Sequence, residues 1–289
     1  MGGGDVVGMK SLGRLLLLPC AASPLVLWGF GWEPASLTVN EVPADLARWS
    51  GPPLRVALLS DLHLGAPWMD VDHLRSIVDA TNAAQPDLVL LLGDYCIDGV
   101  LSGTPIPLET WTPEIGRLDA PLGTFAVLGN HDWWNDGPAV AAALEAVGVP
   151  VLENTAVNLG DLWLVGVGDQ TTGHDDVERA LFDVPEGAAV IAMTHTPDVF
   201  DTMDARVALL VAGHSHGGQV NLPWIGTPIV PSAYVRGHYA VGGRDLFVTS
   251  GLGTSVIPVR FRVPPEVVIL GVGDGGRDQA ARLGPSVAR

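Results

Sequence analysis

Uninterrupted apolar runs of strand length recur along the middle of the chain. They occupy residues 54–60, 88–93, 124–129, 189–194 and 207–213. Runs without a polar face are typical of strands buried in a sheet that helices cover. Between the runs, apolar residues at helical spacing predict helices over 71–84, 138–147 and 176–182. The alternation of strand and helix predicts an α/β fold.

The residues that follow these apolar runs are of the kinds that bind metal ions. In chain order they are Asp61, His63, Asp94, Asn130, His131, Asp132, His195, His214 and His216. Because ligands of α/β sheets gather beyond the carboxyl ends of the strands, we expect these side chains to meet at one edge. Imidazoles, carboxylates and one amide oxygen, without sulfur, suit divalent Mn, Fe, Zn or similar ions.

Such a ligand set is suited to the chemistry of phosphorus. Two ions about 3.5–4 Å apart that share one carboxylate form a clamp for in-line displacement at a phosphoryl group. A water bound to such an ion loses its proton near neutral pH and becomes the nucleophile. A histidine beside the clamp can protonate the departing alkoxide. The pattern therefore favours metal-dependent hydrolysis of a phosphoester.

The ordered motifs resemble those of the calcineurin-like metallophosphoesterase superfamily. They are Asp61-Leu62-His63, Gly93-Asp94, Gly129-Asn130-His131-Asp132, a lone His195 and Gly213-His214-Ser215-His216. Each motif alone is a weak signal, but five in order, each at the end of a predicted strand, are a strong one. The segments GHSHGGQVNLP (213–223), GLGTS (251–255) and PVRFRVPPE (258–266) are similar to the membrane-associated bacterial YkuE-like branch.

The resemblance covers about residues 36–272 and implies a role for each motif residue. Asp61, His63 and His216 would hold a first metal ion. Asn130, His195 and His214 would hold a second, with Asp94 bridging the two ions. His131 would be the general acid, and Asp132 would orient its ring. The implied fold is a four-layer structure, a two-sheet β-sandwich flanked by helices, with the site on one rim. Ser215 stands where the branch more often has Thr, and a twin-arginine pair is missing.

The N-terminal region has the pattern of a membrane segment. Residues 15–32 carry no charge, Lys10 and Arg14 precede them, and Glu33 is the first acid that follows. This arrangement places the downstream chain outside the cytoplasm. The segment is long enough for a retained anchor, and it also fits an export signal cleaved near Gly31. We therefore divide the chain into an anchor or signal (1–35), a phosphoesterase domain (36–272) and a flexible tail (273–289).

Composition excludes several other classes of protein. The chain has 289 residues, of which 47% are hydrophobic and 16% charged, so it is not of the disordered class. With 15 basic and 32 acidic residues, its net charge of −17 opposes non-specific binding to nucleic acid. Two cysteines, Cys20 and Cys96, supply neither a disulfide framework nor a thiolate metal cluster.

Further residues lie near the motifs without belonging to them. Trp68, Trp133, Trp134 and Trp224 either form an apolar rim for an amphiphilic substrate or pack the loops. Asp169 is interpreted as a structural loop acid. Arg260 and Arg262 either bind a substrate phosphate or form ion pairs within the fold.

The leading hypothesis is a membrane-anchored enzyme with two divalent metal ions that hydrolyses a phosphodiester or diphosphate. Its substrate would be an envelope lipid or a sugar-nucleotide, attacked in line by metal-bound hydroxide. A nucleotide or cyclic-nucleotide phosphodiesterase is the alternative within the same chemistry. A metal-containing, envelope-binding protein without catalysis is the alternative from another class.

Overall fold

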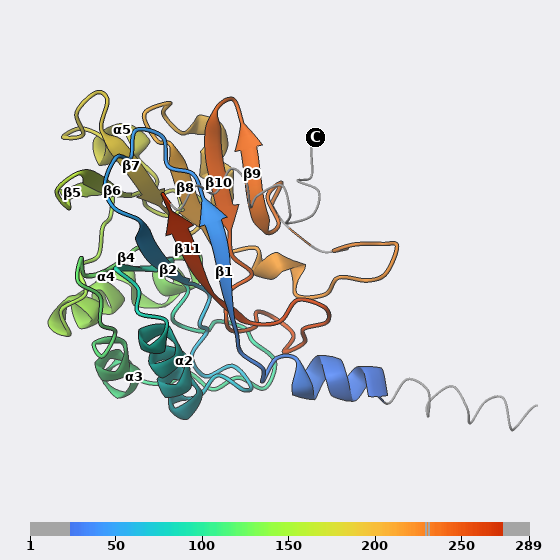
Figure 1. The fold of residues 1–289 in the computed structure, drawn as a ribbon. Coiled ribbons are helices and arrows are strands. Elements are labelled where there is room, and N and C mark those ends of the chain that lie inside the picture. The colour runs from blue at the N-terminus through green and yellow to red at the C-terminus, as the bar shows by residue number, and fades with distance from the viewer. Residues whose placement is uncertain (1–23, 229, 231, 274–289) are drawn as a thin grey trace, which may run out of the picture.

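The computed structural model describes residues 24–228, 230 and 232–273. In this part of the chain, two sheets lie face to face (Figure 1). The first sheet has the strand order β1-β11-β2-β3-β4. Its strands are β1 (Thr38–Ala44), β11 (Glu266–Val272), β2 (Leu54–Leu59), β3 (Leu88–Leu91) and β4 (Thr124–Ala126).

The second sheet has the order β5-β6-β7-β8-β10-β9. Its strands are β5 (Thr155–Asn158), β6 (Leu162–Gly166), β7 (Ala189–Met193), β8 (Leu209–Ala212), β10 (Arg244–Val248) and β9 (Gly237–Val241). β2, β3 and β4 are parallel in the first sheet, and β6, β7, β8 and β10 are parallel in the second. Parallel strands end at the same edge of a sheet, so the loops after them share one end of the sandwich.

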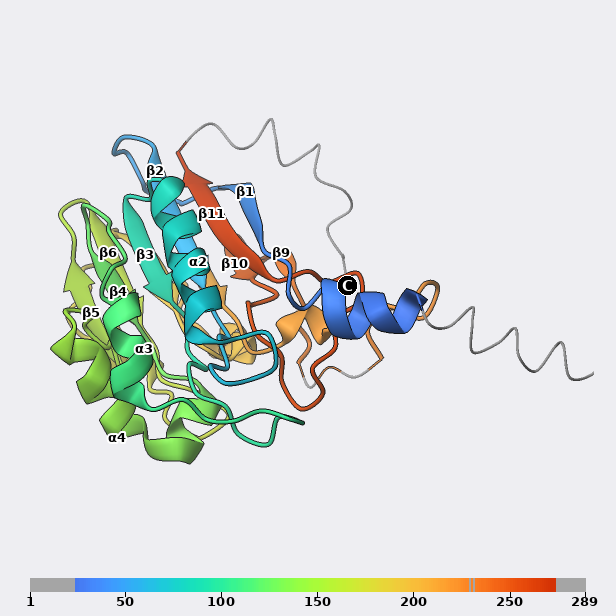
Figure 2. The ribbon, with the colours of Figure 1, turned by 90° about the horizontal axis from the view of Figure 1, so that it is seen from below.

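The helices form the outer layers. α2 (Val71–Ala83), α3 (Leu108–Ile115) and α4 (Asn130–Ala146) cover the outer face of the first sheet (Figure 2). α5 (Val177–Ala180) and the 3-10 helix η2 (Pro197–Thr202) pack on the second sheet. Two shorter elements, the π-helix η1 (Trp28–Trp32) and the 3-10 turn η3 (His216–Gly218), complete the assignment.

Strand periodicity explains the layers. On β2, Val56 and Leu58 face the second sheet, whereas Ala57 and Leu59 face the helices. Both faces of the strand are buried because successive side chains point in opposite directions. This explains the apolar run in the sequence, which only Arg55 interrupts, and the structure confirms the expected two-sheet sandwich flanked by helices.

Most of the predicted elements are present, and their differences from prediction have local causes. The five apolar runs form β2, β3, β4, β7 and β8. The helix predicted over 138–147 begins earlier, at Asn130, and bends at Asp136, where the backbone leaves helical angles (φ −160°, ψ 81°). The predicted helix 176–182 forms only the four residues of α5. α3 was not predicted, because Pro113 interrupts its pattern.

The predicted membrane segment and tail fall mostly outside the described residues, which exclude 1–23 and 274–289. Within the described ranges, no helix combines the length and the apolar character that crossing a membrane requires. The end of the predicted segment contacts the domain. The Glu33 side chain accepts the backbone N–H of Val263 and is buried, and the carbonyl of Gly29 accepts the backbone N–H of Arg260 at 2.9 Å.

Candidate metal centre

The metal-ligand motifs lie in tight turns directly after the strands. Five of the predicted ligands have left-handed backbone conformations, with φ between 47° and 69°; they are Asp61, His63, Asp94, His214 and His216. This conformation is unfavourable for residues other than glycine and concentrates at functional sites. The turns direct the side chains toward a common centre between the two sheets.

Two glycines permit the close approach of these turns. A Cβ atom on Gly129 would lie 2.2 Å from Oδ1 of Asp94. A Cβ atom on Gly213 would lie 1.9 Å from Oγ of Ser60 and 2.6 Å from Oδ2 of Asp61. Glycine is therefore required at both positions because a side chain would overlap the site.

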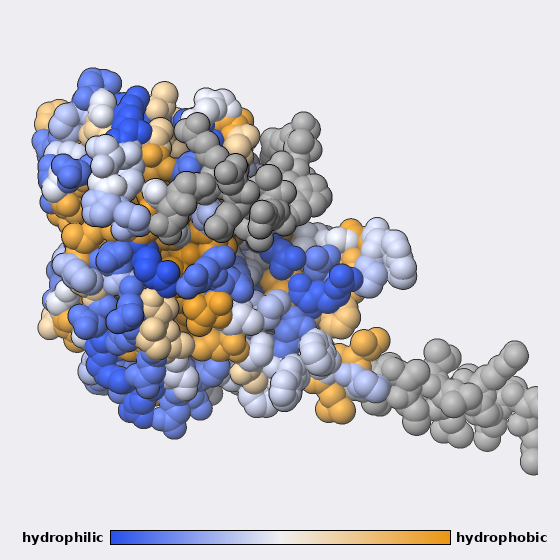
Figure 3. All heavy atoms as spheres, in the orientation of Figure 1, coloured by the Kyte–Doolittle hydropathy of each residue, from blue (hydrophilic) through white to orange (hydrophobic). Residues whose placement is uncertain are grey.

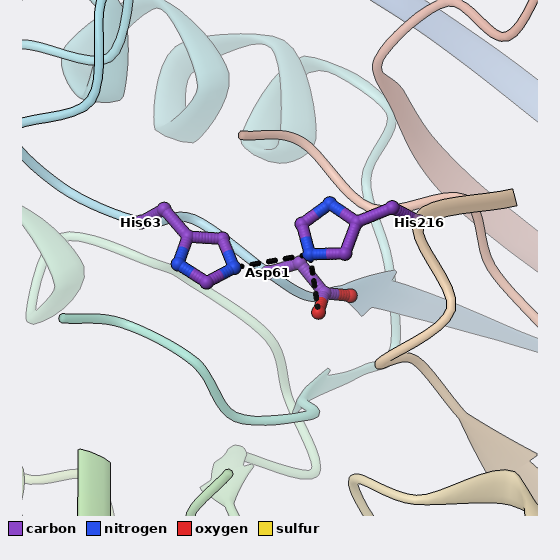
Figure 4. A group of neighbouring side chains, drawn as sticks. All are labelled: Asp61, His63 and His216. Carbon is purple, nitrogen blue, oxygen red and sulfur yellow. Dashed lines mark hydrogen bonds and ion pairs between the residues drawn. The ribbon is translucent and has the colours of Figure 1, made fainter. Parts of the chain in front are cut away.

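A first group of donors consists of Asp61, His63 and His216 (Figure 4). The Nε2 atoms of His63 and His216 lie 3.0 Å apart, and Nε2 of His216 lies 3.4 Å from Oδ1 of Asp61. All three side chains are buried. Nδ1 of neither histidine has a hydrogen-bond partner among the described residues. The three residues converge as a metal-binding triad does.

A second group consists of Asp94, His195 and His214. Nε2 of His195 lies 3.2 Å from Oδ2 of Asp94 and 3.2 Å from Nδ1 of His214. Nδ1 of His195 lies 2.8 Å from the carbonyl oxygen of Leu92. Since a carbonyl only accepts, Nδ1 of His195 carries the proton and Nε2 faces the site. A backbone partner that fixes the tautomer in this way is typical of metal-binding histidines.

The Asp94 carboxylate lies between the two groups. Its Oδ2 atom is 3.2 Å from Nε2 of His195 and 3.6 Å from Nε2 of His63. Its Oδ1 atom accepts the backbone N–H of His131 at 2.9 Å. Asn130, the first residue of α4, is buried, and its Oδ1 atom has no hydrogen-bond partner in the described structure. Asp94 has the position of a shared ligand, and Asn130 keeps an oxygen available.

His131 lies beside this cluster. Its Nε2 atom is 4.0 Å from Oδ2 of Asp94. The edge of its ring packs against His63 and Trp134, with ring centres 4.7 Å and 5.0 Å apart. Its ring is therefore close to the donors and borders the exposed side chain of Trp134.

The contacts of Asp132 differ from those expected of a residue that orients His131. Its two oxygens accept four backbone N–H groups, those of Asp94, Tyr95, Cys96 and Gly129, at 2.8–3.0 Å. Nδ1 of His131 has no hydrogen-bond partner within the described ranges. Asp132 thus joins the turn after β3 to the start of α4. The four amides account for both of its oxygens, so the structure shows no contact that orients the ring.

Burial sets the charge states of the donors. It lowers the pKa of His63 to about 3 and that of His214 to about 4, so both rings are neutral at pH 7. For Asp94, burial acts in the opposite direction to the charge and the hydrogen bond of His195, which hold its pKa well below the ordinary value. Neutral imidazole and ionised carboxylate are the forms that bind metal ions. Burial lowers the pKa of His195, but the Asp94 carboxylate raises it to about 10, so a metal ion at this position would have to displace the proton from Nε2.

The donor set fits divalent cations. It consists of imidazole nitrogens, carboxylates and an amide oxygen, all buried or nearly so, several of them without a partner. Buried polar atoms normally have hydrogen bonds, and unsatisfied ones indicate an ion or water.

Several neighbouring residues have structural roles. The fully buried guanidinium of Arg260 donates to the carbonyls of Ser250, Gly253 and Val263, so it stabilises a loop and does not reach a substrate phosphate. Asp169 accepts hydrogen bonds from Thr172 and Thr196, as expected of a loop acid. The sequence gives no signal for the role of Arg260 or for the backbone carbonyl of Leu92.

The four tryptophans near the motifs divide into two kinds. Trp133 stacks on His174 with ring centres 3.6 Å apart, so it packs a loop. Trp68, Trp134 and Trp224 are exposed over half or more of their surface. The prediction of an apolar rim therefore concerns these three residues.

Comparison with known proteins agrees with the geometry. Residues 54–218 match the family described as calcineurin-like phosphoesterase. The chain is 31% identical to the uncharacterized metallophosphoesterase YkuE of Bacillus subtilis (strain 168), over 83% of this chain and 88% of the relative. It is 28% identical to the phosphodiesterase YaeI of Escherichia coli (strain K12), over 89% of this chain and 97% of the relative.

A longer relative is the transmembrane protein with metallophosphoesterase domain of Danio rerio. It is 28% identical over 91% of this chain and 63% of its own length. The range of the family match, residues 54–218, contains all the predicted site residues. The alternative of a non-catalytic envelope-binding protein is therefore not retained. The chain belongs to the calcineurin-like phosphoesterase family, and within its YkuE-like branch it is a metal-dependent phosphoester hydrolase.

Proposed function

We propose that the protein is a dinuclear phosphodiesterase. One observation carries the proposal: the Asp94 carboxylate lies within 3.6 Å of a histidine nitrogen from each of the two donor groups. Asp61, His63 and His216 would hold one ion, and Asn130, His195 and His214 the other, with Asp94 shared. When bound, the two ions supply Lewis acidity toward the phosphoryl oxygens and activate water.

The protein groups around the ions have separate tasks. Leu92 keeps the His195 ring in one tautomer through its carbonyl, and Asp132 holds the turn that carries Asp94. His131 lies at the margin of the cluster with Nδ1 free of protein partners among the described residues. We propose that its Nε2 atom, 4.0 Å from Oδ2 of Asp94, gives a proton to the leaving alkoxide.

The proposed substrate is a phosphodiester or diphosphate with an apolar part, drawn from the cell envelope. The exposed rings of Trp68, Trp134 and Trp224 support this choice, because aromatic side chains with one wet face bind amphiphilic molecules. The uncharged segment before Glu33 would hold the enzyme at a membrane, with the domain on the extracytoplasmic side.

Hydrolysis of bis-p-nitrophenyl phosphate by the full chain, stripped of metal and refilled with Mn²⁺, tests the proposal. We expect activity to return with the metal. Asp94→Asn should lower it by about 100-fold or more, because the amide weakens both sites. Asp98→Asn, four residues away and exposed, is the matched control and should keep full activity. A fully active Asp94→Asn variant with an unchanged metal content would overturn the proposal.

A further inference from the structure

Five segments beside the metal centre hold no acidic residue, although the chain has 32 and exposed acids adjoin two of the segments at Asp70, Asp98 and Glu109. Four of them are the loops 64–69, 99–108, 217–228 and 251–263, and the helical segment 24–32 lies beside them. In all five segments the only charged residues are Arg260 and Arg262. We call the five segments the neutral rim. It is an exception on a protein with a net charge of −17.

Hydrogen bonds join the segments of the neutral rim into one surface. They run from Thr104 N to Gly65 O (2.8 Å), Leu101 N to Val256 O (2.9 Å), Trp68 Nε1 to Phe30 O (2.9 Å), Arg260 N to Gly29 O (2.9 Å) and Gln219 Nε2 to Ser255 O (3.1 Å). Three of the four loops are also tied to the site. Segments 64–69 and 217–228 follow His63 and His216, and a Cβ atom on Gly251 would touch Asp61.

Large apolar side chains point outward from this surface. Trp32, Trp68, Leu101, Trp224, Ile225 and Val256 are each at least half exposed. Figure 3 shows hydrophobic atoms at the surface where the chain enters its N-terminal helix. Large exposed apolar side chains gathered on loops that hydrogen bonds join indicate a site of interaction.

Three observations favour a lipid bilayer as the partner. Tryptophan is the residue enriched where protein meets the membrane interface. The neutral rim begins with segment 24–32, the end of the uncharged run 15–32. A cavity of about 540 Å³ is also lined by Trp28, Trp32 and Phe261, with Arg262 and the buried Glu33, whose carboxylate accepts the backbone N–H of Val263. The apolar wall of such a cavity is suited to a lipid acyl chain, and the guanidinium of Arg262 is suited to the lipid phosphate.

We infer that the neutral rim docks on the bilayer surface and turns the metal centre toward the lipid headgroups. This inference rests on the proposed function. It adds the face of the protein through which a phosphoester in the membrane would reach the metal centre. The exposed acids Asp70, Asp98 and Glu109 stand at the border of the rim, outside the docking segments.

Depth-dependent fluorescence quenching tests the inference without reference to catalysis. The full chain is reconstituted in phosphatidylcholine vesicles, with or without brominated acyl chains, and carries a thiol-linked fluorophore at Ile225→Cys. The control label is at Val241→Cys, which is similarly exposed and lies at the end of β9, away from η1 in Figure 1. The unsubstituted chain, labelled in the same way, serves as the blank for Cys20 and Cys96.

We expect brominated lipid to quench the label at 225 and to leave the label at 241 unquenched. Equal quenching at both positions, or none at either, would overturn the inference. If the label at 225 is unquenched and sedimentation shows dimers that Trp224→Gln with Ile225→Thr dissociates, the rim is instead an interface between copies of the chain. The quenching and sedimentation results do not depend on whether the enzyme cleaves phosphodiesters, so they test the docking face separately from the proposed function.

Activity gives a second comparison. Trp224→Gln with Ile225→Thr should raise the KM for a vesicle-borne phosphodiester by about tenfold or more, because two apolar side chains no longer enter the lipid. Phe182→Gln with Val241→Thr removes two other exposed apolar groups, outside the neutral rim, and should leave the KM unchanged. Equal effects of the two double variants would contradict the docking face.

Discussion

The Asp132 carboxylate accepts the backbone N–H of Asp94 at 2.8 Å, so the first turn of α4 fixes the turn that carries the shared ligand. The same carboxylate also accepts the backbone N–H groups of Gly129, Tyr95 and Cys96. The site thus depends on Asp132, whose side chain holds the backbone of the shared ligand Asp94.

Asp132→Ala should destabilise the fold by about 3–5 kcal/mol, because four buried amides lose their acceptor. Denaturant unfolding of the metal-free protein measures this loss. Metal affinity should fall in parallel as Asp94 moves. An Asp132→Ala variant with unchanged stability that only shifts the pH profile of activity would instead support the role of orienting His131.

His131→Ala should leave the metal content intact and slow the release of poor leaving groups. We expect the rate of hydrolysis to fall about 10²–10⁴-fold for an alkyl phosphodiester, because its alkoxide leaving group needs a proton. The rate should fall less for a p-nitrophenyl phosphodiester, whose p-nitrophenolate leaves without one. Steady-state rates on the two substrates, with metal analysis, provide the measurement. His238→Ala, on the exposed strand β9, is the control and should match the parent. An equal loss on both substrates would contradict proton donation.

Gly129→Ala should disrupt the metal centre through steric overlap alone. Its backbone is not strained (φ −102°), but the added Cβ would lie 2.2 Å from Oδ1 of Asp94. We expect reduced metal content and activity. Gly31→Ala, where a Cβ meets nothing within 4 Å, should change neither. Retention of the full metal content in Gly129→Ala would show that the Asp94 turn is less constrained than the structure indicates.

Glu153→Gln should stabilise the protein at alkaline pH. The Glu153 carboxyl accepts the backbone N–H of Leu128 at 3.0 Å, and burial raises its pKa to about 7. Because the folded pKa lies above the ordinary value of 4.5, ionisation opposes folding: the cost is absent below pH 4.5 and complete above pH 7. The glutamine keeps an acceptor oxygen and removes the charge.

We expect Glu153→Gln to gain about 1–3 kcal/mol at pH 8 and nothing at pH 4.5, measured by chemical denaturation. Glu178→Gln, an exposed acid on α5, is the matched control and should show no such pH dependence. A gain of equal size at both pH values would mean that the charge of Glu153 is not its cause.

The apolar runs predicted an α/β fold and the convergence of the ligands, because both follow from parallel strands that are apolar on two faces, whereas the two-sheet sandwich was implied by the resemblance to the superfamily. β2 and β8 show the convergence directly, since Asp61 and His214 come within two residues of their ends. The role of Asp132 was not predictable, because its partners are backbone amides that any residue provides. The start of α4 at Asn130 was hidden in the same way, since a motif residue and a helical residue look alike in sequence.

The central claim is that Asp94 is shared by two metal ions. Anomalous diffraction from crystals of the Mn²⁺-loaded protein tests it most directly. We expect two anomalous peaks, one beside Asp61, His63 and His216 and one beside His195 and His214, with the Asp94 carboxylate between them. A single peak at full loading, or two peaks that the Asp94 side chain does not join, would contradict it.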